Sequence, residues 1–164
     1  MKVSATGFEE LVRPCVDPAF RLAHVLLGNH ADAEDAVQES VTRAWRKIHQ
    51  LRCPEAFRPW FLTIVANQCR GARRTRWWQV LRLGDQAPLP PGCEPEDLVA
   101  RLDLRGALRR LSPEDRAALL LFYGLDLPLD EVAAALRITP GAARSRIYRA
   151  VARLRVQMAE ELHR

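Results

Sequence analysis

The sequence predicts an all-α protein made of two small helical domains joined by a Pro-rich linker. Apolar residues recur with the 3.6-residue period of helices along most of the chain, whereas the alternation typical of strands is almost absent. A length of 164 residues allows one domain or two small ones. The apolar content of 48% and the charged content of 27% are ordinary for a globular protein and argue against general disorder.

The first two predicted helices are short and are bounded by proline and glycine. A helix that begins near Phe8 should end or bend at Pro14, because proline removes a helical hydrogen bond. Pro18 suits the first turn of a second helix, which should run through Leu27 and end at Gly28.

A third helix is predicted over residues 32–48, with Asp32 as its N-cap. Val37, Ala44 and Ile48 belong to its apolar face, and Trp45 shares that face at helical spacing. The opposite face carries Asp35, Gln38, Glu39 and Thr42. Because this face is acidic, we expect it to meet a protein or solvent rather than nucleic acid.

A loop over residues 49–55 precedes a fourth helix, whose apolar face starts at Phe57. This helix ends in CRGARRTRWW, where arginines could pair with phosphates while Trp77 and Trp78 stack on exposed bases. Equally, the tryptophans could pack on the core and the arginines could be solvated. Composition does not decide between the two.

Residues 79–95 contain four prolines and two glycines, which is the composition of a linker. We therefore expect a first domain over 1–78, a linker over 79–100 and a second domain over 101–164. Each predicted domain carries 12 basic and 8 acidic residues, whereas the linker carries one basic and four acidic residues. Two basic bodies joined by an acidic segment suggest two contacts with nucleic acid.

The second domain is predicted to end in a helix-turn-helix. After a helix over 95–110, Ser112 can cap a helix that Gly124 ends. The two helices of the motif are expected at 129–136 and from Thr139 onward.

The final helix has the chemistry of a DNA-reading helix. Residues 137–155 contain six arginines and no acidic residue, and Ser145 and Arg149 point directly away from the apolar side. The candidates for contact with base edges are Thr139, Ala142, Ser145, Arg146 and Arg149. The candidates for contact with phosphates are Arg137, Arg144 and Arg153.

The remaining chemistry of the sequence is sparse. The four cysteines form no CxxC pair, and we interpret Cys15 and Cys69 as buried structural thiols. The sequence shows neither a signal peptide nor a run long enough to span a membrane, so we expect a cytoplasmic protein. We expect no metal, cofactor or catalytic residue, because no phosphate-binding loop, nucleophile motif or metal cluster is evident.

Three stretches together resemble the bacterial sigma factors of the sigma-70 family, in the extracytoplasmic-function (ECF) group. DAEDAVQESVTRAWRKI is similar to the helix that binds core polymerase, and FRPWFLTIVANQCRGARRTRW to the helix that recognises and melts the −10 element. The segment from Leu111 to Arg155 is similar to the −35-binding domain. The three stretches follow one another in the order of the family.

The resemblance implies partners and site residues. Core RNA polymerase, promoter DNA and an anti-sigma factor are the implied partners. The β′ subunit would contact Asp35, Gln38 and Glu39, and the linker would thread toward the RNA path of the polymerase. The −10 DNA would meet Trp60, Asn67, Arg70, Arg73 and Arg74, with a flipped base held by the loop at 49–55. The −35 DNA would meet Thr139, Ala142, Arg144, Ser145, Arg146 and Arg149.

Two positions depart from the family pattern. Gly71 stands where the family often has Asp, and glycine weakens a helix. Arg137 stands where the turn usually has Gly, so a positive φ there would be strained.

The alternative function is a stand-alone helix-turn-helix repressor or activator, which would bind duplex DNA without polymerase. A scaffold that binds only protein would leave the arginines unexplained.

Overall fold

The computed structural model describes residues 4–83 and 100–162, and every regular element within these ranges is helical. The prediction of an all-α protein is confirmed. The α-helices are α1 (Ala5–Val12), α2 (Val16–Leu27), α3 (His30–Lys47), α4 (Phe57–Leu83), α5 (Ala100–Arg109), α6 (Pro113–Leu119), α7 (Leu129–Leu136) and α8 (Pro140–Leu162). Short 3-10 turns lie at Arg13–Cys15, Ile48–Gln50 and Pro54–Ala56, and a π-helical turn lies at Leu120–Gly124.

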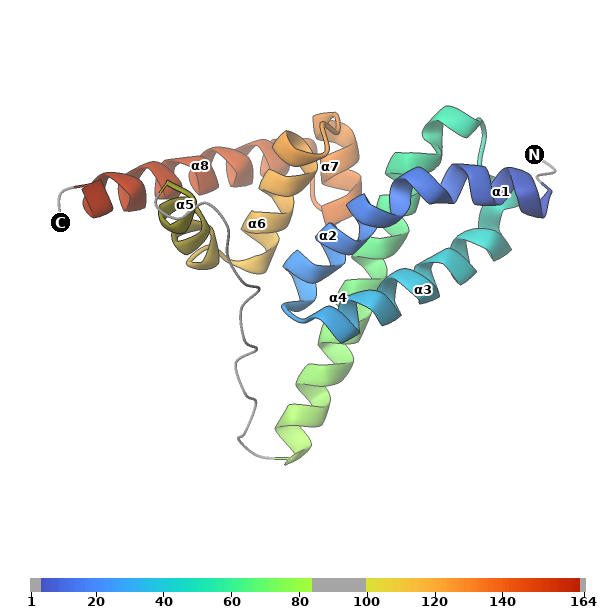
Figure 1. Ribbon diagram of the computed structural model, residues 1–164, viewed down its shortest axis with the longest axis horizontal. Helices are drawn as coiled ribbons and strands as arrows, with labels where there is room; N and C mark the ends of the chain where they lie inside the picture. Colours follow the sequence, from blue (N-terminus) through green and yellow to red (C-terminus); the bar gives the residue numbers. More distant parts are fainter. Residues whose placement is uncertain (1–3, 84–99, 163–164) are drawn as a thin grey trace.

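The N-terminal half is built around α4, on which α1, α2 and α3 pack (Figure 1). Its core contains Phe57, Phe61 and Val65, which are almost completely buried, as the predicted apolar face requires. Trp45 differs from the expectation, because 43% of it is exposed. Its ring still packs against Phe8 in an edge-to-face arrangement, with 5.0 Å between the ring centroids.

Most of the predicted helix ends are confirmed. Pro14 lies in the 3-10 turn after α1, and Gly28 ends α2 with a φ of 81°. The prediction that Asp32 caps α3 is wrong. The cap is Asn29, whose extended backbone lets its Oδ1 accept a hydrogen bond from the Asp32 backbone N–H at 2.8 Å.

The C-terminal half packs α5, α6 and α7 against the long helix α8. Ser112 caps α6, as predicted, and its hydroxyl accepts the backbone N–H of Asp115 at 3.1 Å. The helix-turn-helix formed by α7 and α8 is confirmed. Its turn passes through Arg137, whose φ of 56° and ψ of 43° are left-handed. This conformation is strained for any residue with a side chain, as the sequence analysis expected if φ were positive here.

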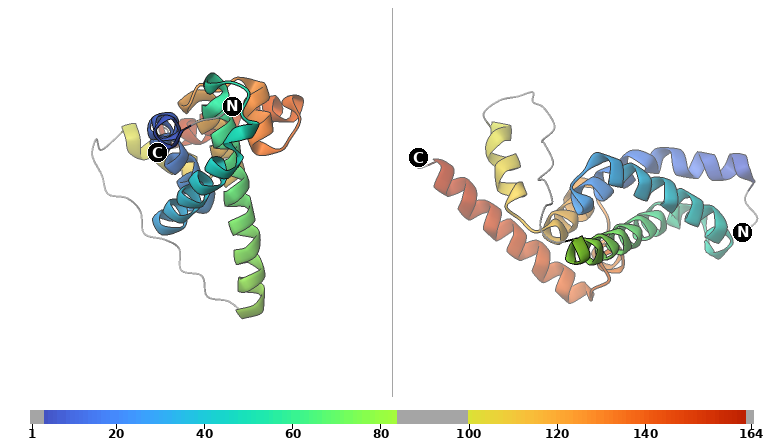
Figure 2. Two further views of the ribbon diagram at one scale, coloured as in Figure 1. Left: turned by 90° about the vertical axis from the view of Figure 1, so that its right-hand side faces the viewer. Right: turned by 90° about the horizontal axis from the view of Figure 1, so that it is seen from below.

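The two halves pack directly against each other, and the sequence did not predict this. Helix α7 lies beside α4, and α2 lies beside α6 (Figure 1). The buried apolar side chains of both halves form one continuous cluster. The C-terminal end of α4 projects away from the other helices, as the left-hand view of Figure 2 shows.

Helix α4 is longer than the sequence analysis expected. It continues through Gly71 and ends at Leu83, so residues 79–83 of the expected linker are helical. Residues 72–83 contain neither proline nor glycine, and nothing in this stretch ends the helix before Gly84. The rest of the predicted linker, residues 84–99, lies outside the described residues. Within the described ranges, none of the helices combines the length and hydropathy of a membrane span.

Candidate functional site

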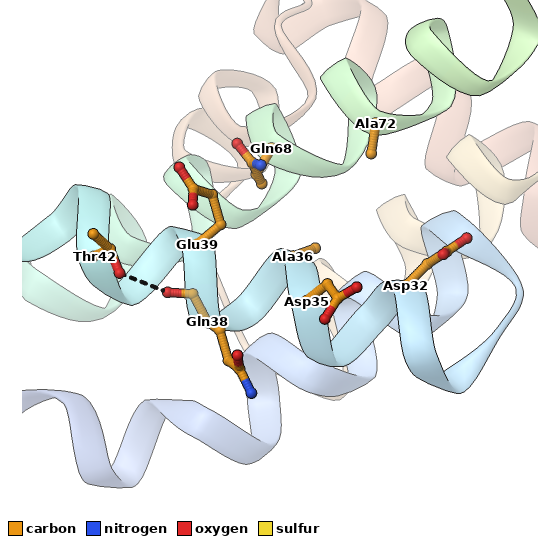
Figure 3. A pocket seen from close by; sticks show the side chains of 8 residues that line it. All are labelled: Asp32, Asp35, Ala36, Gln38, Glu39, Thr42, Gln68 and Ala72. Carbon is orange, nitrogen blue, oxygen red and sulfur yellow. Dashed lines mark hydrogen bonds between the residues drawn. The ribbon is translucent and has the colours of Figure 1, made fainter. Parts of the chain in front are cut away.

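An acidic groove runs between α3 and α4. It has a volume of about 570 Å³ and includes the three residues expected to bind polymerase. The residues that line it are Asp32, Asp35, Ala36, Gln38, Glu39, Thr42, Gln68 and Ala72. Glu39 points toward Gln68 on α4, whereas Gln38 points away from α4 (Figure 3). Asp35 and Glu39 are exposed, and Arg43 on the same helix lies 3.3 Å from the Glu39 carboxylate and partly offsets its negative charge.

Gln68 and Ala72 contribute to this groove but were absent from the sequence prediction. They lie four residues apart and therefore on one face of α4. By helical spacing they continue the stripe of Phe61 and Val65 along α4, beyond the part of that stripe that the core buries. The spacing of Gln68 and Ala72 indicates that they share a face, but only the packing of α4 on α3 shows which surface they complete.

The residues of α4 expected to contact −10 DNA are not freely exposed. Trp60, Asn67, Arg70 and Arg73 are all partly buried. Arg70 donates a hydrogen bond to the Asn67 Oδ1 at 3.0 Å and another to the backbone carbonyl of Ala135. Arg73 forms an ion pair with Glu114. Arg74 lies in α4, but its side chain is outside the described residues.

Partial burial shifts the pKa values of Arg70 and Glu114, which lie where α4 meets the C-terminal half. Burial, together with the nearby positive charge of Arg137, lowers the pKa of the Arg70 guanidinium. Burial disfavours the charged form of Glu114, but hydrogen bonds to its own backbone N–H and to Arg73 outweigh burial and lower its pKa. Glu114 is therefore held as a carboxylate beside Arg73.

The outer face of α8 carries the predicted −35 residues. Thr139, Ala142, Arg144, Ser145 and Arg149 are exposed, whereas Arg146 is partly buried. Ala143, Ile147 and Ala150 point the other way and are buried against the rest of the C-terminal half. Arg149 donates from Nε to the Ser145 carbonyl at 3.3 Å. The structure thus brings these predicted residues together on one surface, while their contacts with DNA stay a prediction.

Asp115 and Tyr148 are two further residues of this surface that the sequence analysis missed. The Asp115 carboxylate lies between Arg146 and Arg153, with N–O distances of 3.9 Å and 3.3 Å. Tyr148 is 76% exposed and follows Ser145 by three residues, which places both on the outward face of α8. The sequence alone could have indicated Tyr148, because it lies at helical spacing from the arginines of α8. The position of Asp115 beside these arginines depends on tertiary packing and could not be read from the sequence.

The three cysteines within the described residues are free thiols. Cys15 and Cys69 are buried, as the sequence predicted, and Cys53 is exposed. Burial raises the pKa of Cys69 to about 12 and also raises that of Cys15, because an apolar surrounding disfavours the thiolate. Across residues 4–83 and 100–162, no three His, Cys, Asp or Glu residues are grouped as a metal site would require. Cys93 lies outside the described residues.

Comparison with known proteins assigns both halves of the chain to one family. The family model for sigma-70 region 2 matches residues 11–79, and the model for sigma-70 region 4 matches residues 101–154. The ECF RNA polymerase sigma factor SigL of Mycobacterium tuberculosis is 34% identical over 148 residues, which cover 86% of this chain and 82% of SigL. The chain belongs to the ECF sigma factors of the sigma-70 family.

Other relatives agree with this membership. The RNA polymerase sigma-E factor of Streptomyces coelicolor is 30% identical over 92% of this sigma factor and 85% of its own length. The ECF RNA polymerase sigma factor SigE of Mycolicibacterium smegmatis is 35% identical over 94% of this chain, but the match spans only 62% of SigE.

Solved structures share the fold of this sigma factor. The sigma factor RpoE of Bartonella quintana, solved in complex with the anti-sigma factor NepR, superimposes with a TM-score of 0.81 at 24% identity. The superposition covers 93% of this chain and 96% of RpoE. CnrH, solved in complex with the cytosolic domain of CnrY, gives a TM-score of 0.67 at 24% identity over 96% of this chain and 90% of CnrH.

Proposed function

We propose that this sigma factor binds core RNA polymerase and directs it to specific promoters. The observation that carries the proposal is the combination of one acidic groove with two separate arginine-bearing helix faces in a single chain. A stand-alone repressor needs only the arginines of α8. An acidic groove on the same chain suits a protein partner, because negative charge is repelled by DNA.

The acidic groove is the proposed polymerase site. Asp35, Gln38 and Glu39 lie on exposed positions of α3, where a partner helix with basic side chains could pair with the carboxylates. Gln68 and Ala72 extend the same site onto α4. By family membership the partner is the β′ subunit of core polymerase, with further contacts to the β subunit.

The two arginine-bearing faces are the proposed DNA sites. On α4, Arg70 and Arg73 would bind the −10 DNA, with Trp60, Asn67 and Arg74 beside them. Cationic and aromatic side chains bind single-stranded DNA well. Unstacking a base from the duplex costs only a few kcal/mol, which such contacts can offset. On α8, Ser145 and Arg149 would meet base edges of the −35 element. The predicted division into domains over 1–78 and 101–164 follows these two tasks.

Three further parts of the proposal follow from family membership. The protein would act in the cytoplasm, where the polymerase works. It would supply no catalytic chemistry of its own, since the polymerase forms the phosphodiester bonds. Because RpoE of Bartonella quintana was solved with an anti-sigma factor, we propose that a comparable inhibitor binds this chain.

Run-off transcription tests the proposal. Bacterial core polymerase is incubated with a promoter library from the source genome, with and without this protein. Discrete transcripts that depend on the protein are expected, and their upstream sequences would define the −10 and −35 elements. Absence of transcripts, together with sequence-specific binding of duplex DNA by the protein alone, would support the repressor instead.

A further inference from the structure

A stripe of four residues runs along α4 next to its buried face. Trp60, Ile64, Asn67 and Gly71 are spaced i, i+4, i+7 and i+11, which places them within about 60° of one another around the helix. All four are partly buried, and Trp60 and Ile64 pack against the edge of the core. We call these four residues the outer stripe. Trp60 and Asn67 are already proposed to bind the −10 DNA, so the outer stripe belongs to that site.

The side chains of the outer stripe become smaller along the helix. Trp60 carries an indole, which packs against Phe57 with 5.8 Å between the ring centroids. Asn67 carries a short amide, whose Oδ1 accepts a hydrogen bond from Arg70 at 3.0 Å. Gly71 carries no side chain at all. A strand that lies along the outer stripe would therefore approach the backbone of α4 most closely at Gly71.

Within the part of the chain that the structure describes, nothing requires a glycine at position 71. A Cβ at this position would meet no heavy atom within 4 Å outside the local turns of its own helix. Its φ is not in the left-handed region, which Gly28 alone occupies among the described glycines. A glycine inside a helix nevertheless raises the unfolding equilibrium constant about fivefold relative to alanine. Neither packing nor backbone conformation offsets this cost, so the reason for a glycine lies outside the described fold.

We propose that Gly71 is the point at which the sugar–phosphate backbone of single-stranded −10 DNA comes closest to α4. The strand would lie along the outer stripe, with a base stacked against Trp60 and with the Asn67 Nδ2 group donating a hydrogen bond to the DNA. A side chain at position 71 would lift the strand away from the helix and weaken both contacts. This inference rests on the proposed function, because it adds a residue to the same −10 site.

The chemistry of the outer stripe favours a nucleic-acid strand over a protein as its occupant. Trp60 offers a ring on which any base can stack, and the guanidinium of Arg70, bonded to Asn67, places positive charge beside the stripe. The acidic groove lies on the next face of α4, where Gln68 and Ala72 line it. Because Gly71 borders that face, the polymerase is the competing occupant of position 71, and the test must separate the two.

Two variants of the full-length chain fill the space at position 71 in steps. Gly71→Ala and Gly71→Leu introduce good helix formers of increasing size, so neither should disrupt α4. Gly106→Ala and Gly106→Leu are the matched controls. Gly106 lies inside α5, where a Cβ would also meet no described atom within 4 Å beyond its own helix, and α5 carries no residue assigned to DNA. Both alanine variants should lower the unfolding equilibrium constant about fivefold in urea denaturation.

The readout for DNA is fluorescence anisotropy with a labelled single-stranded DNA of random sequence, roughly 16 nucleotides long, without polymerase. Loss of one stacked base weakens binding roughly 5- to 150-fold, and a methyl group should remove only part of that contact. We therefore expect Gly71→Ala to bind about threefold more weakly than Gly106→Ala, and Gly71→Leu about tenfold or more weaker than Gly106→Leu. The affinity for core polymerase should be equal in all four variants.

Equal DNA affinities of the Gly71 and Gly106 variants would overturn the proposed contact. Failure of Gly71→Ala to stabilise the fold as Gly106→Ala does would also overturn it, because the glycine would then have a reason within the chain. A loss of affinity for core polymerase that matches the loss for DNA would assign position 71 to the polymerase instead.

Run-off transcription separates failure of this contact from failure of the proposed function. Transcripts that depend on the protein, together with equal DNA affinities of the variants, would leave a sigma factor without a DNA contact at Gly71. Weaker DNA binding by Gly71→Leu, in a protein that drives no transcription, would leave the contact in a protein that does not serve the polymerase.

Discussion

The carboxylate of Asp115 lies 3.3 Å from the guanidinium of Arg153, although 38 residues separate them. The other oxygen of the same carboxylate lies 3.9 Å from Arg146. Asp115 is in the first turn of α6, and both arginines are on α8. An acidic residue of α6 thus partly neutralises the charge of the helix proposed to read DNA.

Asp115→Asn should release Arg146 and Arg153 to bind phosphates indiscriminately. We expect tighter binding of α8 to random duplex DNA, and the slope of log affinity against log salt should steepen by about one for each additional phosphate contact. Discrimination between promoter and random DNA should fall. Titration at several salt concentrations measures both effects, with Asp130→Asn as the control for net charge. A slope equal to that of the control would show that Asp115 does not restrain the two arginines.

The sequence predicted the helices well because their signals are local. The apolar period placed α3, α4 and α8, and Ser112 and Gly28 marked helix ends through their own backbone preferences. Asp32 was assigned as a cap in error, because Asn29 belongs to the same class of capping residues and only the backbone conformation distinguishes them.

The docking of the two halves could not be predicted in this way. The period of the apolar residues predicts which face of a helix is buried. It does not predict which other helix packs against that face. Arg70 and Arg73 read as exposed cations from their positions on α4, whereas their acceptors belong to Ala135 and Glu114, more than 40 residues further along the chain. The sequence therefore predicted which residues of α4 belong to the candidate site, but it did not predict that residues of the C-terminal half pack against them.

Asp35→Lys should weaken binding to core polymerase. The substitution places a positive charge in the acidic groove of α3 and α4, where a basic partner surface would be repelled. We expect at least a tenfold loss of affinity, or about 1.4 kcal/mol, measured by fluorescence anisotropy with labelled sigma factor. Glu10→Lys on the exposed surface of α1 makes the same charge change outside the groove. Unchanged affinity of Asp35→Lys would remove the groove from the polymerase interface.

Arg149→Ala should impair promoter selection and leave core binding intact. Arg149 is exposed on the outward face of α8, and an arginine paired with a base edge contributes about 1–3 kcal/mol of discrimination. Transcription from promoters with a −35 element should therefore fall about 5- to 150-fold. Arg155→Ala, which removes an equal charge nearer the end of α8, is the control. An equal loss of affinity for core polymerase would refute the assignment of Arg149 to DNA.

The buried thiols should resist alkylation in the folded protein. Because burial raises the pKa of Cys69 to about 12, its reactive thiolate is scarce at pH 8, and the raised pKa of Cys15 acts in the same direction. Iodoacetamide should modify Cys53 and spare both buried residues, as peptide mass spectrometry can establish. The same shift makes the folded state lose stability as the pH rises from about 9 toward 12. Rapid labelling of Cys69 at pH 8 without denaturant would contradict its burial.

Arg137→Gly should stabilise the fold and weaken DNA binding at the same time. Arg137 ends α7 with φ 56°, a conformation that costs a residue with a side chain about 1–2 kcal/mol and costs glycine little. Part of the gain is lost because glycine makes the unfolded chain more flexible, so we expect a net increase of about 1 kcal/mol in the free energy of unfolding. The loss of one positive charge should reduce the salt dependence of duplex binding by about one phosphate contact. Arg137→Ala separates the two effects, since alanine removes the charge but keeps the strain. If Arg137→Ala proved as stable as Arg137→Gly in urea denaturation, the backbone strain at the turn would be refuted, and the charge of Arg137 beside Arg70 would account for the change instead.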